Sequence, residues 1–523
     1  MSQDPVPAEV PEAKRSRAWR GLLIVLGLVL VLGFVLGQGL SSSPGLLLVE
    51  HQLGQVKAGR FGQLKVTGLK GNLLSSFGAR QVSLSDAKGV WIRVDDLEVT
   101  WQPAEILSRT VHVTGLTARQ VTVLRRPILT APTPPRALPV NLRLDGIAAR
   151  VETRPEASVR RGLFDLTGDL AVARKRGGLR SHLKAISLLH KGDQLVAELD
   201  LRKGHPLVVL AEASEARGGA LAGGLGLAVD QPFSLKIAAD GRQAAGRITA
   251  IATVGSRQPL KADGAWTAKG ARLDGRLDLT ASQRTAWLAR RIGPDLTLKL
   301  SSVEATAPFQ TVSLDLRTGQ AHLEARGDVD IKARTLAPAG AKLRIEAADL
   351  ESLIFSSERK GLGLGQSVVS GLLKTTKAGW SLEGRGQVAF VAWGAYGLQA
   401  LEGPLSLAKT KAGLDLTLGL TGKGGAGSGF VAGRLGARPE LALTASRLKD
   451  GRYLIRKLKL AGPGLKLDAE GNRGLLGGLG FKGKAEIVSR PGAEGAFNGS
   501  WTASQAGPGK AWVLSVDGRG QKL

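Results

Sequence analysis

The sequence predicts an all-β protein: an elongated antiparallel sheet curled into a groove, preceded by one transmembrane helix. Apolar residues make up 43% of the 523 residues but aromatic ones only 4%, so most apolar side chains are aliphatic and tile a surface. The 71 glycines follow no collagen period and are typical of many turns between strands. The chain is too long for one compact core, but an elongated sheet avoids that limit because each strand packs only against its neighbours.

The transmembrane helix is predicted at residues 21–40, GLLIVLGLVLVLGFVLGQGL, which contain no charge. Twenty helical residues span about 30 Å, the thickness of a bilayer's hydrocarbon core. The basic cluster at 14–20 favours a cytoplasmic N-terminus. A cleaved signal peptide is the alternative, with small residues at 37–43, but the apolar run is longer than such peptides carry. We therefore expect a basic cytoplasmic tail at 1–20, an uncleaved signal anchor in the inner membrane and a periplasmic body.

Beyond a short helix predicted at 45–59, apolar residues alternate with polar ones at period two, which is typical of strands with one buried face. Short loops such as 86–89, 267–270 and 410–413 separate these segments and predict antiparallel meanders. At Asp95 and Asp96 the alternation slips by one residue, which predicts a bulge or bend. The alternating aliphatic residues that we expect to line the groove are Val82, Leu84, Val90, Ile92, Val94, Val111, Val113, Leu296, Leu298, Leu300, Leu414, Leu416, Leu418 and Leu420.

The chain is predicted to divide at residues 127–139, PILTAPTPPRALP, whose five prolines exclude a central strand. This segment is a linker or an extended edge segment. It separates a first β module at 41–126 from a long β-meander at 140–523. Two helical interruptions are expected in the second module, at 282–293 and at 349–361, because each ends at a glycine and has apolar residues at helical spacing.

No constellation of residues with catalytic or metal-binding spacing is recognisable. Cysteine is absent, the six histidines lack metal-ligand spacing, and neither HExxH nor GxSxG occurs. His112 lies between two strand valines and is expected to face solvent. We therefore expect no enzyme, no cofactor and no metal site. Stacking aromatics are too scarce to favour nucleic acid as a partner.

The formal charge is +28, from 72 lysines and arginines against 44 acidic residues. A field of this sign attracts anionic partners, such as lipid headgroups, lipopolysaccharide or nucleic acid. The alternative is that the basic residues only solubilise the outer face of a twisted sheet.

Residues 68–127 resemble the N-terminal module of the TamB family (translocation and assembly module, inner-membrane subunit), within the AsmA-like superfamily. The resemblance is carried by a run with Leu84, Asp86, Gly89 and Trp91, and by two further groups. These are a second run with Trp101, Pro103 and Leu107, and the closing Arg125, Arg126 and Pro127. Members of this family are longer and end in a domain that works with an outer-membrane barrel partner, TamA. This chain ends in SVDGRGQKL and is expected to lack that domain.

The resemblance implies bridge-like movement of phospholipids from the inner to the outer membrane, within outer-membrane biogenesis. An apolar groove would serve this purpose by exposure of aliphatic side chains, with basic residues at its rims holding phosphate headgroups. The alternative is a translocation and assembly subunit that inserts or secretes outer-membrane proteins and autotransporters with a barrel partner. A surface adhesin remains a third class.

Overall fold

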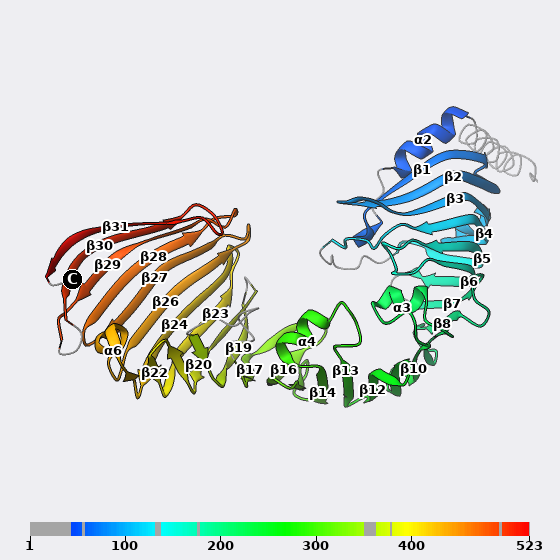
Figure 1. Ribbon diagram of the computed structural model, residues 1–523. Helices are drawn as coiled ribbons and strands as arrows, with labels where there is room; N and C mark the ends of the chain where they lie inside the picture. Colours follow the sequence, from blue (N-terminus) through cyan, green and yellow to red (C-terminus); the bar gives the residue numbers. More distant parts are fainter. Residues whose placement is uncertain are drawn as a thin grey trace, which may run out of the picture. The chain divides into compact units, whose positions relative to one another are not determined.

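The computed structural model describes residues 43–54, 58–130, 138–174, 178–349, 362–376, 379–490 and 494–521, most of which form strands (Figure 1). The expected cytoplasmic tail and signal anchor lie outside these residues, as does nearly all of the helix predicted at 349–361. In the part of the chain that is described, no helix combines the length and the hydropathy that a bilayer crossing requires.

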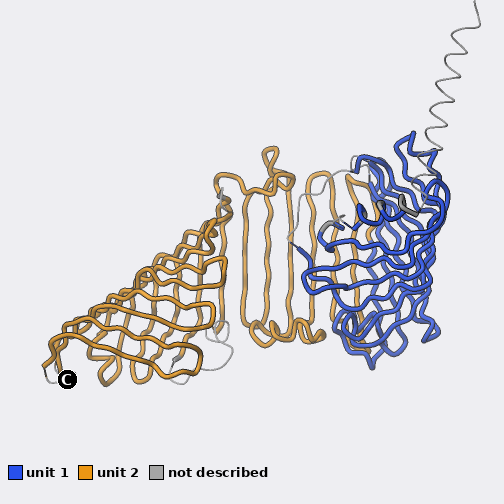
Figure 2. Tube along the Cα trace, turned by 90° about the horizontal axis from the view of Figure 1, so that it is seen from above, with its two compact units in different colours: residues 1–238 blue, residues 239–523 orange. Residues whose placement is uncertain are grey.

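The chain forms two compact units, Met1–Ala238 and Ala239–Leu523 (Figure 2). The boundary lies within strand β10 (Phe233–Arg242). Over the described residues, 27 strands join into one hydrogen-bonded sheet that is not closed into a barrel. Its pairs follow chain order and are antiparallel with one exception, which confirms the all-β prediction and its antiparallel meanders.

Unit 1 begins with helix α2 (Ser43–Leu53) and also contains two 3-10 helices, η1 (Gly59–Phe61) before β1 and η2 (Pro103–Ser108) between β3 and β4. Helix α3 (Ala220–Leu225) follows the last full strand of the unit. Its strands before β10 are β1 (Gln63–Asn72), β2 (Ser76–Asp86), β3 (Gly89–Gln102), β4 (Thr110–Val123), β5 (Asn141–Thr153), β6 (Gly162–Ala173), β7 (Gly178–Ser187), β8 (Gln194–Asp200) and β9 (Leu207–Glu215).

Helix α2 confirms the helix predicted at 45–59, although it ends earlier, at Leu53. Proline is tolerated in a first helical turn because its missing N–H has no intrahelical acceptor there, and Pro44 occupies that position. The helix lies beside the edge strand β1, where the Glu50 carboxylate accepts the Leu69 N–H at 2.5 Å. One of the edge donors that would otherwise invite another strand is therefore satisfied.

Strands β4 and β5 form the exception, a parallel pair. A parallel pair needs a long connection, and residues 124–140, which include the proline-rich segment 127–139, provide it. The two strands on either side of that segment are thus direct neighbours in the sheet, and both belong to the compact unit that ends at Ala238.

The start of this connection is fixed by Asp86, which is the last residue of β2, at the turn to β3. The Asp86 carboxylate accepts two hydrogen bonds from Arg125, at 2.6 and 2.9 Å, and the backbone N–H of Ile128 at 2.6 Å. Arg125 also donates to the Gly89 carbonyl at 2.7 Å. The Arg125 guanidinium holds the pKa of the Asp86 carboxyl far below its usual range. Three residues that carry the family resemblance therefore meet in one contact.

The predicted irregularity in β3 is present at Asp96, whose φ is 49°. The ladders to β2 and β4 pass over this residue and keep their registers on both sides, so no extra residue is inserted. The left-handed backbone turns the strand about its axis, which accounts for the change in phase of the apolar residues.

Unit 2 contains helices α4 (Ala286–Ile292) and α6 (Gly429–Leu435) and a small second sheet of β18 (Leu362–Leu364), β21 (Val391–Trp393), β22 (Tyr396–Leu398) and β25 (Ala426–Gly427). Helix α4, followed by Gly293, confirms the helix predicted at 282–293. The main-sheet strands after β10 are β11 (Ala245–Val254), β12 (Arg257–Thr267), β13 (Gly270–Asp278), β14 (Asp295–Glu304), β15 (Gln310–Arg317), β16 (Ala321–Asp330), β17 (Thr335–Ala347), β19 (Ser367–Thr376), β20 (Gly379–Val388), β23 (Ala400–Lys409), β24 (Gly413–Lys423), β26 (Glu440–Leu448), β27 (Tyr453–Gly462), β28 (Leu465–Arg473), β29 (Leu479–Ile487), β30 (Ala496–Gln505) and β31 (Trp512–Gln521).

Replacing Asp86 by Asn should release the start of the β4–β5 connection, because the neutral amide loses the ion pair with Arg125. We expect amide hydrogen exchange at residues 124–130 of the full chain to accelerate at least tenfold. Asp165→Asn is the matched control, since its contact with Arg150 is long, at 3.8 Å, and exposed. Equal exchange in the two variants would show that Asp86 does not fix the connection.

Candidate functional site

The registers of the ladders show which side chains share a face, because directly opposed residues point to the same side of a sheet. In unit 2, one row of opposed residues runs from β11 to β31, and every member is apolar. The row consists of Ile248, Gly264, Leu273, Leu300, Leu314, Ala325, Leu343, Gly371, Gly384, Leu405, Leu418, Leu443, Leu458, Ala469, Gly483, Trp501 and Val516. We call the side of the sheet that carries this row the aliphatic face.

The neighbouring row, one residue along each strand, points to the opposite side and is polar. Its members from β12 to β20 are Asp263, Asp274, Lys299, Asp315, Glu324, Arg344, Ser370 and Arg385. Ion pairs such as Arg272 with Asp274 and Lys459 with Asp468 tie residues of this charged face together. The two faces of the sheet therefore differ sharply in chemistry.

Unit 1 repeats this arrangement. A row from β1 to β9 contains only apolar residues: Leu69, Ala79, Leu97, Ala118, Ala149, Leu166, Ala185, Leu195 and Ala213. The parallel pair β4–β5 does not interrupt it, since Ala118 is opposed to Ala149. Each unit therefore has an aliphatic face of its own.

Nearly all of the residues expected to line a groove lie in such apolar rows. Val82 is opposed to Val94, and Leu416 to Leu407, for example. Two residues at strand ends differ: Val90 is opposed to Ser85, and Leu414 to Lys409 and Arg447. Among the predicted residues Val113 is buried, whereas most of the others are only half-buried.

Short elements, among them α3 and α6 (Figure 1), pack on parts of the aliphatic faces. In unit 1, Ala220 of α3 packs with Phe164 and Ala185 of the sheet. In unit 2, Leu435 of α6 packs with Tyr396 and Leu398 of the small sheet, and with Leu460 and Leu465 of the main sheet. Sequence periodicity does not predict α3 or α6, because both helices are shorter than two turns.

The main sheet of unit 2 is hollowed on both faces. An apolar hollow of about 510 Å³ lies on the aliphatic face beside α6, where β27 to β31 contribute Leu460, Leu467, Ile487 and Trp501 among its walls. A larger hollow of about 750 Å³ lies between the charged rows of β13 to β19 and includes Arg272, Lys299 and Arg344. Two chemically different surfaces are thus available to ligands.

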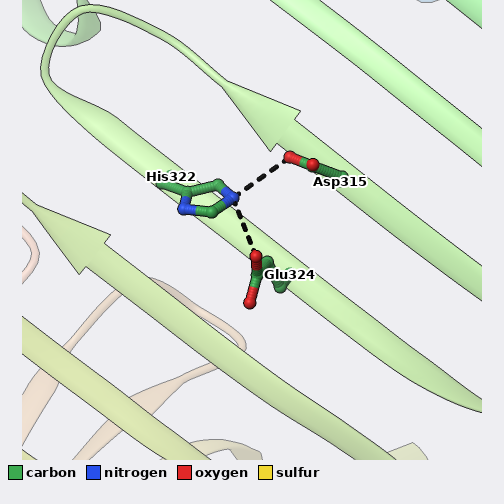
Figure 3. Close-up of side chains that lie close together, drawn as sticks. All are labelled: Asp315, His322 and Glu324. Atoms are coloured by element: carbon green, nitrogen blue, oxygen red, sulfur yellow. Dashed lines mark hydrogen bonds and ion pairs between the residues drawn. The ribbon is translucent and has the colours of Figure 1, made fainter.

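A cluster of Asp315, His322 and Glu324 on β15 and β16 borders this charged hollow (Figure 3). The His322 Nε2 lies 3.1 Å from Asp315 and 3.3 Å from Glu324. These ligand types could hold a divalent cation, and sequence spacing missed them because the sheet supplies Asp315 from a neighbouring strand. Asp315 is already bonded to Arg317, which lowers the pKa of its carboxyl, so ion pairing accounts for the arrangement without a metal.

His112 does not face solvent, which corrects the expectation from its position between two valines. Its side chain is buried, and its two ring nitrogens lie 2.7 Å from Glu105 of η2 and 2.7 Å from Asp145 of β5. Arg143 in turn pairs with Asp145 at 2.7 Å. The hydrogen bond to Glu105, followed by that to Asp145, raises the pKa of His112. Alternation alone missed this because η2 covers the polar side of β4.

No protein-family model matches the chain, and no curated protein matches it.

The network around His112 should make the stability of unit 1 depend on pH. Folding raises the pKa of His112. Its contribution to the free energy of unfolding is therefore fully present below the pKa of the unfolded chain, about 6.5, and is lost as pH rises through the pKa of the folded chain. We expect the thermal midpoint for unfolding of unit 1, followed in the full chain by hydrogen exchange of its strands, to fall by roughly 2–4 °C for each kcal/mol lost on going to alkaline pH. His112→Gln should remove this dependence, whereas His190→Gln, at an exposed site, should keep it. The same slope in both variants would exclude His112 as its origin.

Proposed function

We propose that this protein carries phospholipids from the inner toward the outer membrane along an apolar β groove, without enzymatic chemistry. The observation that carries the proposal is the apolar row from β11 to β31, which no charged side chain interrupts. We infer that the sheet curls so that the aliphatic face lines the groove and the charged face meets water.

Such a surface lowers the free-energy cost of moving a lipid through water. Each methylene in water costs about 0.8 kcal/mol, so acyl tails with about 30 methylenes would cost roughly 24 kcal/mol to cross an aqueous compartment bare. An aliphatic face whose residues are only half-buried offers contacts that replace that water. The net charge of +28 adds attraction for anionic headgroups.

The resemblance of residues 68–127 to the TamB family supports the same function, and membership of that family is part of the proposal. It brings with it an inner-membrane anchor at 21–40 and a periplasmic body. The contact of Asp86 with Arg125 and Gly89 gives the resembling residues a shared structural role, since it joins both ends of the motif.

Lipid that co-purifies with the full chain tests this function. Leu418→Asp places a charge in the middle of the apolar row, and we expect it to reduce the bound phospholipid per chain at least threefold by mass spectrometry. Thr417→Asp is the matched control, because Thr417 precedes Leu418 in β24 and its side chain is exposed on the charged face. Absence of phospholipid from the wild type, or an equal loss in both variants, would refute the conduit.

Strand β31 favours a second candidate function, assembly of outer-membrane proteins with a barrel partner. Over the described residues it pairs with β30 alone, and all of its residues are exposed. Trp512, Val513, Leu514 and Val516 are each more than half exposed. A long apolar edge strand is a template to which another strand can add.

A photo-crosslinking residue at Val513 in the full chain in cells tests this candidate. Strand addition predicts a crosslink to an outer-membrane β-barrel protein that is lost when Leu514 is replaced by Pro, because proline disrupts strand pairing. A crosslinker at Thr417 provides the control. Crosslinks from Val513 to lipid alone would argue for the conduit and against assembly.

A further inference from the structure

Four hairpin turns lie side by side at one end of the main sheet of unit 2. Because antiparallel strands in chain order place every second turn at the same end, residues from separate hairpins meet there. The Lys449 N–H donates to the Ala412 carbonyl at 3.0 Å, and a Cβ at Gly477 would lie 2.8 Å from the Pro508 ring. We call these turns together the turn surface, which consists of residues 410–412, 449–452, 474–478 and 506–511.

Two leucines form the tip of the turn at 474–478. The Gly474 N–H donates to the Gly478 carbonyl at 2.9 Å and closes the turn around them. Leu475 is 66% exposed and Leu476 is 92% exposed. Leu475 also reaches the neighbouring turn, since a Cβ at Gly451 would lie 3.9 Å from its side chain. Single exposed leucines are common on protein surfaces, but two adjacent ones at the tip of a closed turn make an apolar point that faces water.

Two aromatic rings flank this apolar point. Tyr453 is the first residue of β27 and Trp512 the first of β31, and they are 43% and 52% exposed. The guanidinium groups of Arg447 and Arg473 lie 5.8 and 6.0 Å from the centre of the Tyr453 ring. Tyrosine and tryptophan side chains are amphipathic and gather at the headgroup level of membranes, where a cation beside the ring meets phosphate.

Basic residues dominate the surroundings of the apolar point. Asp450 is the one acidic residue in the four turns, and it pairs with Arg452 at 2.8 Å. An excess of positive charge at the surface attracts an anionic partner. The basic residues in or directly beside the turns, all of them exposed, are Lys409, Lys411, Arg447, Lys449, Arg452, Arg473 and Lys510.

We propose that the turn surface docks on an anionic phospholipid bilayer. An apolar point, amphipathic rings and an excess of cations correspond to the acyl boundary, the headgroups and the charged surface of such a bilayer. Leu475 and Leu476 enter the acyl boundary, while the rings of Tyr453 and Trp512 lie among the headgroups. This inference does not depend on the proposed function, because the turn surface lies at strand ends and the bilayer is a partner that is contacted and not a lipid that is carried.

A fluorophore at the tip of the turn tests the docking. The chain contains no cysteine, so Leu476→Cys gives a single site for the environment-sensitive label NBD. In the full chain, held in a phosphatidylcholine nanodisc, we expect NBD fluorescence to rise at least twofold with vesicles containing about one-third phosphatidylglycerol. Pure phosphatidylcholine vesicles should cause no rise. Ser489→Cys is the matched control, because Ser489 is exposed and lies beyond the opposite end of β29.

Charge reversal tests the role of the basic residues. Lys449→Glu combined with Lys510→Glu should weaken the affinity of the labelled chain for these vesicles at least tenfold, since each basic residue near an anionic surface adds to the attraction. Lys457→Glu combined with Lys484→Glu is the matched control. It makes the same change of charge at exposed lysines within β27 and β29, away from the turns.

No rise at Leu476→Cys, an equal rise at Ser489→Cys, or an equal loss of affinity in both charge variants would overturn the inference. An equal rise with monomeric dihexanoyl phosphatidylglycerol would also overturn it, because a single headgroup would then suffice without a bilayer. A rise caused by a lipid-free extract of envelope proteins, and not by vesicles, would assign the turn surface to a protein partner instead. Leu418→Asp should leave the response to vesicles unchanged, so failure of the conduit and failure of the docking are distinguishable.

Discussion

The register of the strand ladders is the constraint on which the rest of this structure depends. Side chains alternate with period two, so a slip of one residue in any ladder would move every following leucine to the charged side. The bulges show that the constraint is maintained. The ladder between β26 and β27 shifts register after Thr444. Before the shift Leu443 is opposed to Leu458, after it Ala445 is opposed to Ile455, and Arg456 is the extra residue on β27. The aliphatic face stays apolar because the insertion is absorbed locally.

Small residues make the aliphatic face of unit 2 uneven. Gly371 and Gly384 are opposed in neighbouring strands, and a Cβ at Gly384 would lie 2.1 Å from the Ser370 carbonyl oxygen. No larger side chain fits this pair without movement of the backbone. Near the C-terminal strands, Gly483 is opposed to Trp501, so the residue directly opposite the indole has no side chain. The row therefore contains both large apolar side chains and glycines without side chains. The apolar hollow lies between this part of the sheet and α6.

Charge is distributed by the same register. On the charged face some opposed residues, such as Asp274 and Lys299, have opposite signs, and exposed pairs of this kind solubilise the sheet while contributing little stability. Three buried groups follow a different rule. Asp86 and His112 have partners that fix local structure in unit 1, whereas Arg434 is held by carbonyls alone. That difference distinguishes charges that are paired with an ionisable group from one that is held by neutral backbone carbonyls.

The sequence by itself determined the strand class, because alternation at Leu296, Leu298 and Leu300 is a local property of the chain, and a glycine after Ile292 marks the end of α4. It also predicted the irregularity near Asp96, since a change of phase is visible in the letters. Only the tertiary structure decided which residues oppose one another across strands. Leu300 and Leu418 lie in one row because of successive pairings that no local pattern encodes. The burial of His112 and the pairing of Asp86 with Arg125 join residues from separate elements. The same holds for Arg434 and the backbone carbonyls of Glu494 and Gly495, because such contacts depend on distance in space and not on spacing along the chain.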